Sequence, residues 1–124
     1  MLFRSVSQSR SGGSGTGIIN NGRDYERGNS EYHSITDASQ SGLDFGDEDF
    51  SVSLWINAES DISYGLIHKL ASSAGYQLTH NSGFNTLDWN VRKDGFTTGT
   101  ESFSFTISTG TWYHIVCWHD PTGS

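Results

Sequence analysis

Carboxylate side chains crowd one short stretch of this 124-residue chain, at Asp44, Asp47, Glu48 and Asp49. Carboxylate and carbonyl oxygens are the ligands that a hard cation such as Ca²⁺ prefers. The spacing lacks the glycine-centred loop of an EF-hand, so the pattern is not specific to calcium. Two interpretations stay open: a calcium site with Asp44, Asp47 and Asp49 as ligands, or a solvated acidic turn that only terminates a strand.

A second group of metal-capable side chains lies near the end of the sequence, at His114, Cys117 and His119. In a β-strand, alternation places His114 on one face and Cys117 with His119 on the other. One zinc ion could then be held by two of these side chains at most, whereas structural zinc sites use four ligands. We therefore expect these residues to pack rather than to bind zinc. Cys117 is the only cysteine, so the chain contains no internal disulfide.

Aromatic side chains form the third group, because an exposed flat ring can stack on a sugar. They make up 13% of the chain, and we expect most of them to be buried, since aromatic rings that alternate within strands usually pack in a core. The candidate ligand-binding rings are Trp55, Tyr64 and Tyr76. Trp55 is the strongest candidate because it shares a strand face with serine and asparagine. If a second sheet covers that face, Trp55 is a core residue instead.

Short β-strands must position all of these residues. Fifteen glycines, one proline and the absence of sustained helical periodicity favour an all-β chain. Residues 50–57 alternate apolar and polar side chains with period two, which indicates a half-buried strand. The stretch 112–118 is apolar on both faces, which predicts a central strand covered on both sides. The predicted strands are residues 32–35, 50–57, 64–70, 76–80, 87–92, 103–107 and 112–118, the pattern of an antiparallel β-sandwich.

The domain organisation follows from the composition along the chain. Residues 1–30 are rich in serine and glycine and predict a flexible leader, while residues 31–124 predict one partial sandwich domain. The start of the chain has no apolar stretch long enough for a secretory signal, and no segment approaches a membrane span. The formal net charge of −7 argues against a nucleic-acid partner, because phosphate binding needs clustered cations.

Three stretches together carry a family likeness: LDFGDEDFSVSLWIN, YGLIHKLASSAGYQL and STGTWYHIVCWHDPTG. In their order and spacing they resemble laminin G-like domains, including pentraxins, within the concanavalin A-like lectin/glucanase superfamily. The resemblance extends from Tyr32 to Gly123 and implies an all-β, antiparallel, jelly-roll-like sandwich. In that family further strands follow the last motif, so we expect the sandwich to be incomplete at its C-terminus and the chain to be a fragment or to close its sheets by association.

The resemblance implies a non-catalytic binding or adhesion module for a glycan or a protein surface, outside the cell or on a virion. Calcium is the one candidate cofactor. The pentraxin likeness adds Asp61 and Asn81 as candidate calcium ligands, with Asp120 a weaker match. The superfamily's glucanases carry a Glu-x-Asp-x-Glu pattern, which this chain lacks, so we expect no enzymatic activity.

An alternative from another functional class stays open. The same sandwich could be a structural spacer or interaction part of an extracellular or virion assembly, with no small ligand of its own. Unpaired strand edges would then promote self-association, because their backbone groups can pair with another chain.

Overall fold

The structure, a computed structural model, describes residues 7–10, 14–16, 21–23, 25, 31–36, 39–40, 42–45, 48–60, 63–70, 74–93 and 96–122. The chain divides into two compact units, Met1–Leu43 and Asp44–Ser124. Within the described residues, no helix has the length and apolar character needed to cross a membrane.

In its described residues, the first unit contains two short antiparallel ribbons. Strand β1 (Ser7–Arg10) pairs with β4 (Tyr32–Ser34), and β2 (Ser14–Thr16) pairs with β3 (Asn21–Arg23). The sequence predicts a flexible leader over residues 1–30, whereas the structure pairs three short strands within it. Apolar periodicity could not predict these strands, because backbone pairing in a Ser/Gly-rich segment leaves no alternating apolar pattern.

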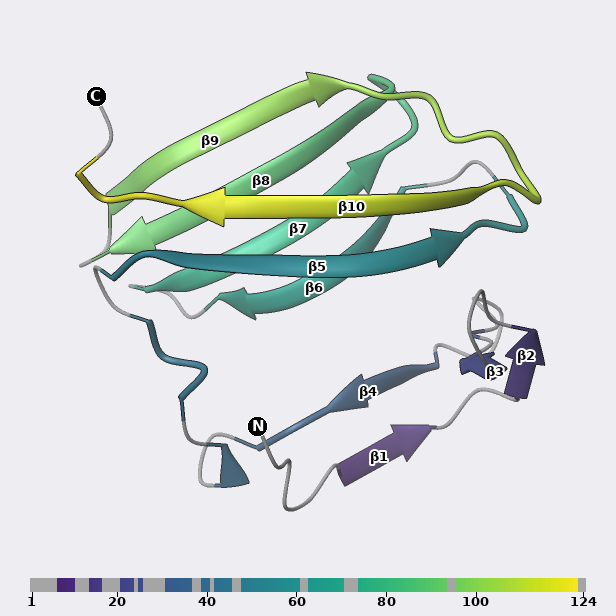
Figure 1. Ribbon diagram of the computed structural model, residues 1–124, viewed down its shortest axis with the longest axis horizontal. Coiled ribbons are helices and arrows are strands. Elements are labelled where there is room, and N and C mark those ends of the chain that lie inside the picture. Colours follow the sequence, from purple (N-terminus) through teal and green to yellow (C-terminus); the bar gives the residue numbers. More distant parts are fainter. Residues whose placement is uncertain are drawn as a thin grey trace. The chain divides into compact units, whose positions relative to one another are not determined.

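The second unit is an antiparallel β-sandwich of two sheets (Figure 1). One sheet is a four-stranded meander in the order β6 (Tyr64–Leu70), β7 (Gly75–Asn81), β8 (Thr86–Lys93) and β9 (Phe96–Ser104). The other pairs β5 (Phe50–Asn57) with β10 (Trp112–His119), which are far apart in the sequence. The predicted all-β, jelly-roll-like sandwich is confirmed.

The hydrophobic core lies between these two sheets. Each sheet is antiparallel and turns one face inward, so its strands alternate buried and more exposed side chains. In β5 this alternation is complete, and its apolar face is the one predicted from the sequence. The buried members of the core are Tyr76 and Leu78 on β7, Leu87, Trp89 and Val91 on β8, and Ile115 and Cys117 on β10.

Strand β10 differs from its prediction. Only the face with Ile115 and Cys117 is buried, whereas Val116 and Trp118 on the opposite face are exposed. The prediction of a central strand covered on both sides is therefore wrong for the described part of the chain. A continuous apolar run does not show whether a second layer of protein covers its outer face.

Strand β9 begins earlier and ends earlier than the predicted strand 103–107. Pairing with β8 stops at Ser104, and the backbone N–H of Phe105 then donates to the carbonyl of Asn85 at 2.7 Å. Phe105 and Ile107 still pack inward from the connection to β10. The apolar alternation therefore continues past the end of the strand because core packing, and not ladder pairing, places these two side chains.

Candidate functional site

The outer face of the β5–β10 sheet is the main candidate site. The register aligns Trp55 with His114 and Ser51 with Trp118. Trp55 is 47% exposed and Trp118 is 70% exposed, and both belong to the face opposite the core. We call this surface the outer face and define it by Ser51, Ser53, Trp55, His114, Val116 and Trp118.

The ring of Trp55 is held in place by its cross-strand neighbour. The Trp55 and His114 rings are stacked, with centroids 4.7 Å apart and planes 17° from parallel. His114 Nε2 lies 2.7 Å from Ser53 Oγ, a hydrogen bond that fixes the imidazole in turn. The sequence left open whether another sheet buries Trp55. In the second unit no described strand does so, and the ring presents a preorganised apolar surface.

Trp118 borders a shallow depression at one end of the sheet, where β5 begins and β10 ends. The depression encloses about 370 Å³. Its lining combines one exposed indole with two carboxylates, an imidazole and a hydroxyl, all of which can meet a polyhydroxylated ligand. The lining residues are Asp49, Phe50, Ser51, Trp118, His119 and Asp120.

The two exposed indoles are spaced for an extended ligand. Trp118 lies opposite Ser51, four positions from Trp55 along β5. At a rise of about 3.3 Å per residue, the rings are therefore offset by about 13 Å along the strands. This arrangement can stack on two separated parts of an oligosaccharide or on two side chains of a protein.

The other two predicted ring platforms occupy different positions. Tyr76 is 6% exposed and packs against Phe45, Phe50 and Trp89, and burial raises the pKa of its hydroxyl. A ring at this position cannot stack on a ligand, so the structure does not support the predicted role of Tyr76. Tyr64 is half-buried, and the centroid of its ring lies 5.2 Å from that of the buried His80 ring. Tyr64 is therefore less accessible than either indole of the outer face.

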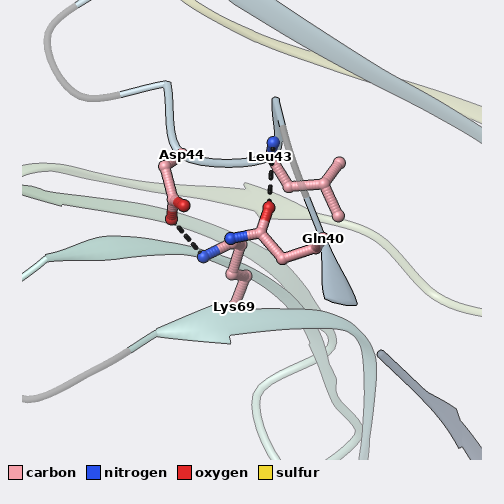
Figure 2. A network of polar contacts seen from close by, with 4 residues as sticks. All are labelled: Gln40, Leu43, Asp44 and Lys69. Atoms are coloured by element: carbon pink, nitrogen blue, oxygen red, sulfur yellow. Dashed lines mark hydrogen bonds and ion pairs between the residues drawn. The ribbon is translucent and has the colours of Figure 1, made fainter. Parts of the chain in front are cut away.

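Asp44, the first predicted calcium ligand, forms an ion pair with Lys69 at the end of β6 (Figure 2). This pairing supplies the charge partner that a cation would otherwise provide. Just before it in the sequence, the backbone N–H of Leu43 donates to Gln40 Oε1 at 3.2 Å. The ion pair thus links the connection that leads into β5 to the end of β6.

Of the other predicted calcium ligands, the two that the structure describes do not form a metal-binding group with Asp44. Asp49 lines the depression beside Trp118, whereas Asn81 Oδ1 accepts a hydrogen bond from the backbone N–H of Gly83 in the β7–β8 turn. Asp47 and Asp61 lie outside the described residues. Among the residues that the structure does describe, no group of three His, Cys, Asp or Glu side chains could hold a metal ion.

The histidine and cysteine side chains of β10 follow the predicted alternation. His114 lies on the outer face, and Cys117 is buried on the inner face. Burial raises the pKa of the Cys117 thiol, which disfavours the thiolate that metal binding and nucleophilic chemistry require. His119 packs against Phe50.

Sequence reasoning missed Trp118 and His114 as members of the site. Both lie in residues 112–118, for which the sequence predicts a strand covered on both sides. The sequence did contain a signal for them. Period-two alternation along this strand places Ile115 and Cys117 on one face and His114 and Trp118 together on the other. Their proximity to Trp55 also needed the pairing of β10 with β5, which the sequence pattern does not specify.

A family model described as the concanavalin A-like lectin/glucanases superfamily matches residues 27–124. Comparison with curated proteins and with solved structures gave no match. The matched region includes every strand of the sandwich and both indoles of the outer face. With most of its length matched, the chain belongs to the laminin G-like group of the concanavalin A-like lectin/glucanase superfamily.

Proposed function

We propose that this protein is a non-catalytic binding module that recognises a glycan through the outer face of the β5–β10 sheet. The observation that carries the proposal is the pair of exposed indoles, Trp55 and Trp118, on one face of a two-stranded layer. Large apolar rings grouped on a surface commonly mark a binding site, because leaving them in water is unfavourable. Membership of the superfamily supports a ligand that is a carbohydrate or a protein.

The geometry favours a glycan because the face combines two flat indole rings with the hydroxyl groups of Ser51 and Ser53. Each indole offers a rigid surface for the apolar face of a sugar ring. Ser51, Asp49 and Asp120 surround Trp118 with hydrogen-bonding oxygens suited to sugar hydroxyl groups. The stacking of Trp55 on His114 reduces the conformational entropy lost on binding, since the ring is already held.

The proposal assigns no catalytic step to this face. The chain lacks the Glu-x-Asp-x-Glu pattern of the superfamily's glucanases. Calcium assistance stays a prediction. Asp49 and Asp120 are the two carboxylates that line the depression, and a chelator distinguishes calcium-assisted from direct binding.

A second candidate function is a structural interaction part with no small ligand. It is favoured by the composition of the outer face, which contains no Asp, Glu, Lys or Arg. An uncharged aromatic face in a protein of net charge −7 also suits a protein partner.

The test is a glycan array followed by calorimetric titration of the oligosaccharides that bind. Burying an aromatic ring contributes about 1.5–3 kcal/mol, so Trp118→Ala should weaken binding roughly tenfold or more. Trp55→Ala should act in the same direction. The matched control is Phe84→Ala, which removes a 78% exposed ring from the β7–β8 turn and should leave binding unchanged.

The alternatives give different results in the same experiments. Loss of binding in chelator would establish calcium assistance, and release of reducing sugar would contradict the non-catalytic assignment. Binding that both tryptophan variants retain would place the glycan site elsewhere. If no glycan binds and the protein self-associates as its concentration rises, the second candidate function, a structural interaction part, would be favoured.

A further inference from the structure

His114 is the one side chain among the six that define the outer face whose charge changes near neutral pH. The other five residues are two serines, two tryptophans and a valine. A histidine side chain gains or loses its proton between about pH 5 and 8, depending on its surroundings. Proton uptake at His114 therefore converts an uncharged aromatic face into a face with one positive charge.

Two cross-strand contacts hold the His114 ring beside Trp55. The register pairs His114 with Trp55, and the two rings stack with centroids 4.7 Å apart. His114 Nε2 lies 2.7 Å from the Oγ atom of Ser53 on the neighbouring strand. A serine hydroxyl can donate to a neutral imidazole nitrogen or accept from a protonated one. Ser53 can therefore hold the ring in either protonation state, so that protonation alters the charge beside Trp55 rather than the contacts of the ring.

A positive charge on His114 would oppose the stacking of a sugar on Trp55. An imidazolium beside an indole is attracted to the electrons of the indole ring, and the weakly positive C–H groups of a sugar need the same electrons. A bound glycan would also displace water from His114, which is exposed, and removing water from a charged group is unfavourable. Both effects make the neutral imidazole the form that favours binding.

The outer face contains no charged group that would offset this effect. The strands that carry it are β10 and its partner β5, and their outer-face side chains include no Asp, Glu, Lys or Arg. Titratable groups lie only near the ends of this two-stranded layer: Asp49, His119 and Asp120 line the depression, and Glu59 follows the end of β5. An anionic glycan could pair with the imidazolium, but the net charge of −7 disfavours such a ligand.

We infer that the outer face binds an uncharged glycan and that this binding is coupled to the release of a proton from His114 to the solvent. His114 is thus a positioning residue, which acts on the glycan through Trp55. The inference rests on the proposed function and specifies its ligand class and its dependence on pH. A cation–π contact at an exposed site is equivalent to about a two- to fivefold change in affinity, so binding should weaken by this factor as His114 becomes protonated.

The test is calorimetric titration of the full chain at about pH 8 and about pH 5, the limits of ordinary histidine titration. The probe is cellohexaose, or the uncharged oligosaccharide that binds most tightly on the glycan array. Its affinity should be about two- to fivefold higher at the higher pH. Titration at an intermediate pH, in two buffers that differ in ionisation enthalpy, should show that binding releases protons.

The decisive variant is His114→Gln, which keeps a flat group able to hydrogen-bond to Ser53 but cannot titrate. It should still bind the probe at the higher pH, and it should lose both the pH dependence and the proton release. The matched control is His68→Gln, which removes an exposed histidine from β6 in the other sheet and should retain both.

The outcomes separate this inference from the proposed function. Unchanged pH dependence in His114→Gln, or tighter binding at the lower pH, would overturn the inference alone. Proton release that His119→Gln removes and His114→Gln retains would assign it to the depression and would also overturn the role of His114. An absence of glycan binding, or binding that both Trp55→Ala and Trp118→Ala retain, would overturn the inference and the proposed function together.

Discussion

Substitution of Leu78 by alanine tests whether the core between the two sheets stabilises this protein. Leu78 is 1% exposed on the inner strand β7, where the register places it between Ile67 and Trp89. Its neighbours belong to a continuous four-stranded ladder and cannot collapse freely into a cavity. We therefore expect Leu78→Ala to lower the free energy of unfolding by about 3–5 kcal/mol, within the range for buried leucines.

Such a loss is large against the total stability of a small domain, which is about 5–15 kcal/mol. It corresponds to a fall in Tm of roughly 15–30 °C for a unit of this size. Urea unfolding followed by tryptophan fluorescence measures the free energy, and calorimetry measures Tm. The matched control is Leu54→Ala on β5, whose side chain is half-buried and should cost about half as much.

The comparison between these two variants decides the outcome. If Leu78→Ala costs less than about 1 kcal/mol, or no more than Leu54→Ala, the two sheets do not enclose the core described here. A change in the urea m-value would indicate instead that the variant alters the compactness of the denatured or native state.

Two further predictions concern the backbone and the cysteine. Gly75→Ala should lower the free energy of unfolding in urea by about 1–3 kcal/mol or more. The reason is that Gly75 has φ 130°, and a Cβ there would lie 1.8 Å from the carbonyl oxygen of Lys69. The control is Gly65→Ala in the same hairpin, whose Cβ would meet no atom within 4 Å and which should be nearly neutral. Equal effects of the two glycine variants would contradict this argument. Cys117 is buried and should resist thiol reagents until the protein unfolds. Because burial raises the pKa of its thiol, the contribution of Cys117 to stability should be full below the ordinary thiol pKa and fall as the pH rises through the raised value. A stability profile at alkaline pH identical to that of Cys117→Ala would refute this.

Much of the fold follows from local pattern. The alternation over β5 predicts both its bounds and its buried face, because a half-buried strand repeats with period two. The Ser/Gly-rich strands of the first unit and the end of β9 were not predictable in this way. In the first case the strands carry no apolar alternation, and in the second the alternation continues into a connection that packs on the core.

The candidate site, like the fold, was only partly predictable from the sequence. Trp55 could be proposed from sequence because its strand partners on that face are polar. Tyr76 could not be excluded, since an apolar strand position does not reveal whether it faces a core or solvent. The sequence makes Asp44 a candidate metal ligand, whereas in the structure its carboxylate pairs with Lys69, a residue remote in sequence.

An all-β sandwich of the concanavalin A-like lectin/glucanase superfamily is predictable from the amino-acid sequence, because alternation and motif order are properties of neighbouring residues. Which aromatic rings stay exposed depends instead on the packing of distant strands. The pairing of β10 with β5 brings Trp118 and His114 onto the face of Trp55. Exposure depends on which distant strands pack together, and that pairing is settled by burial of the whole core rather than by any one segment.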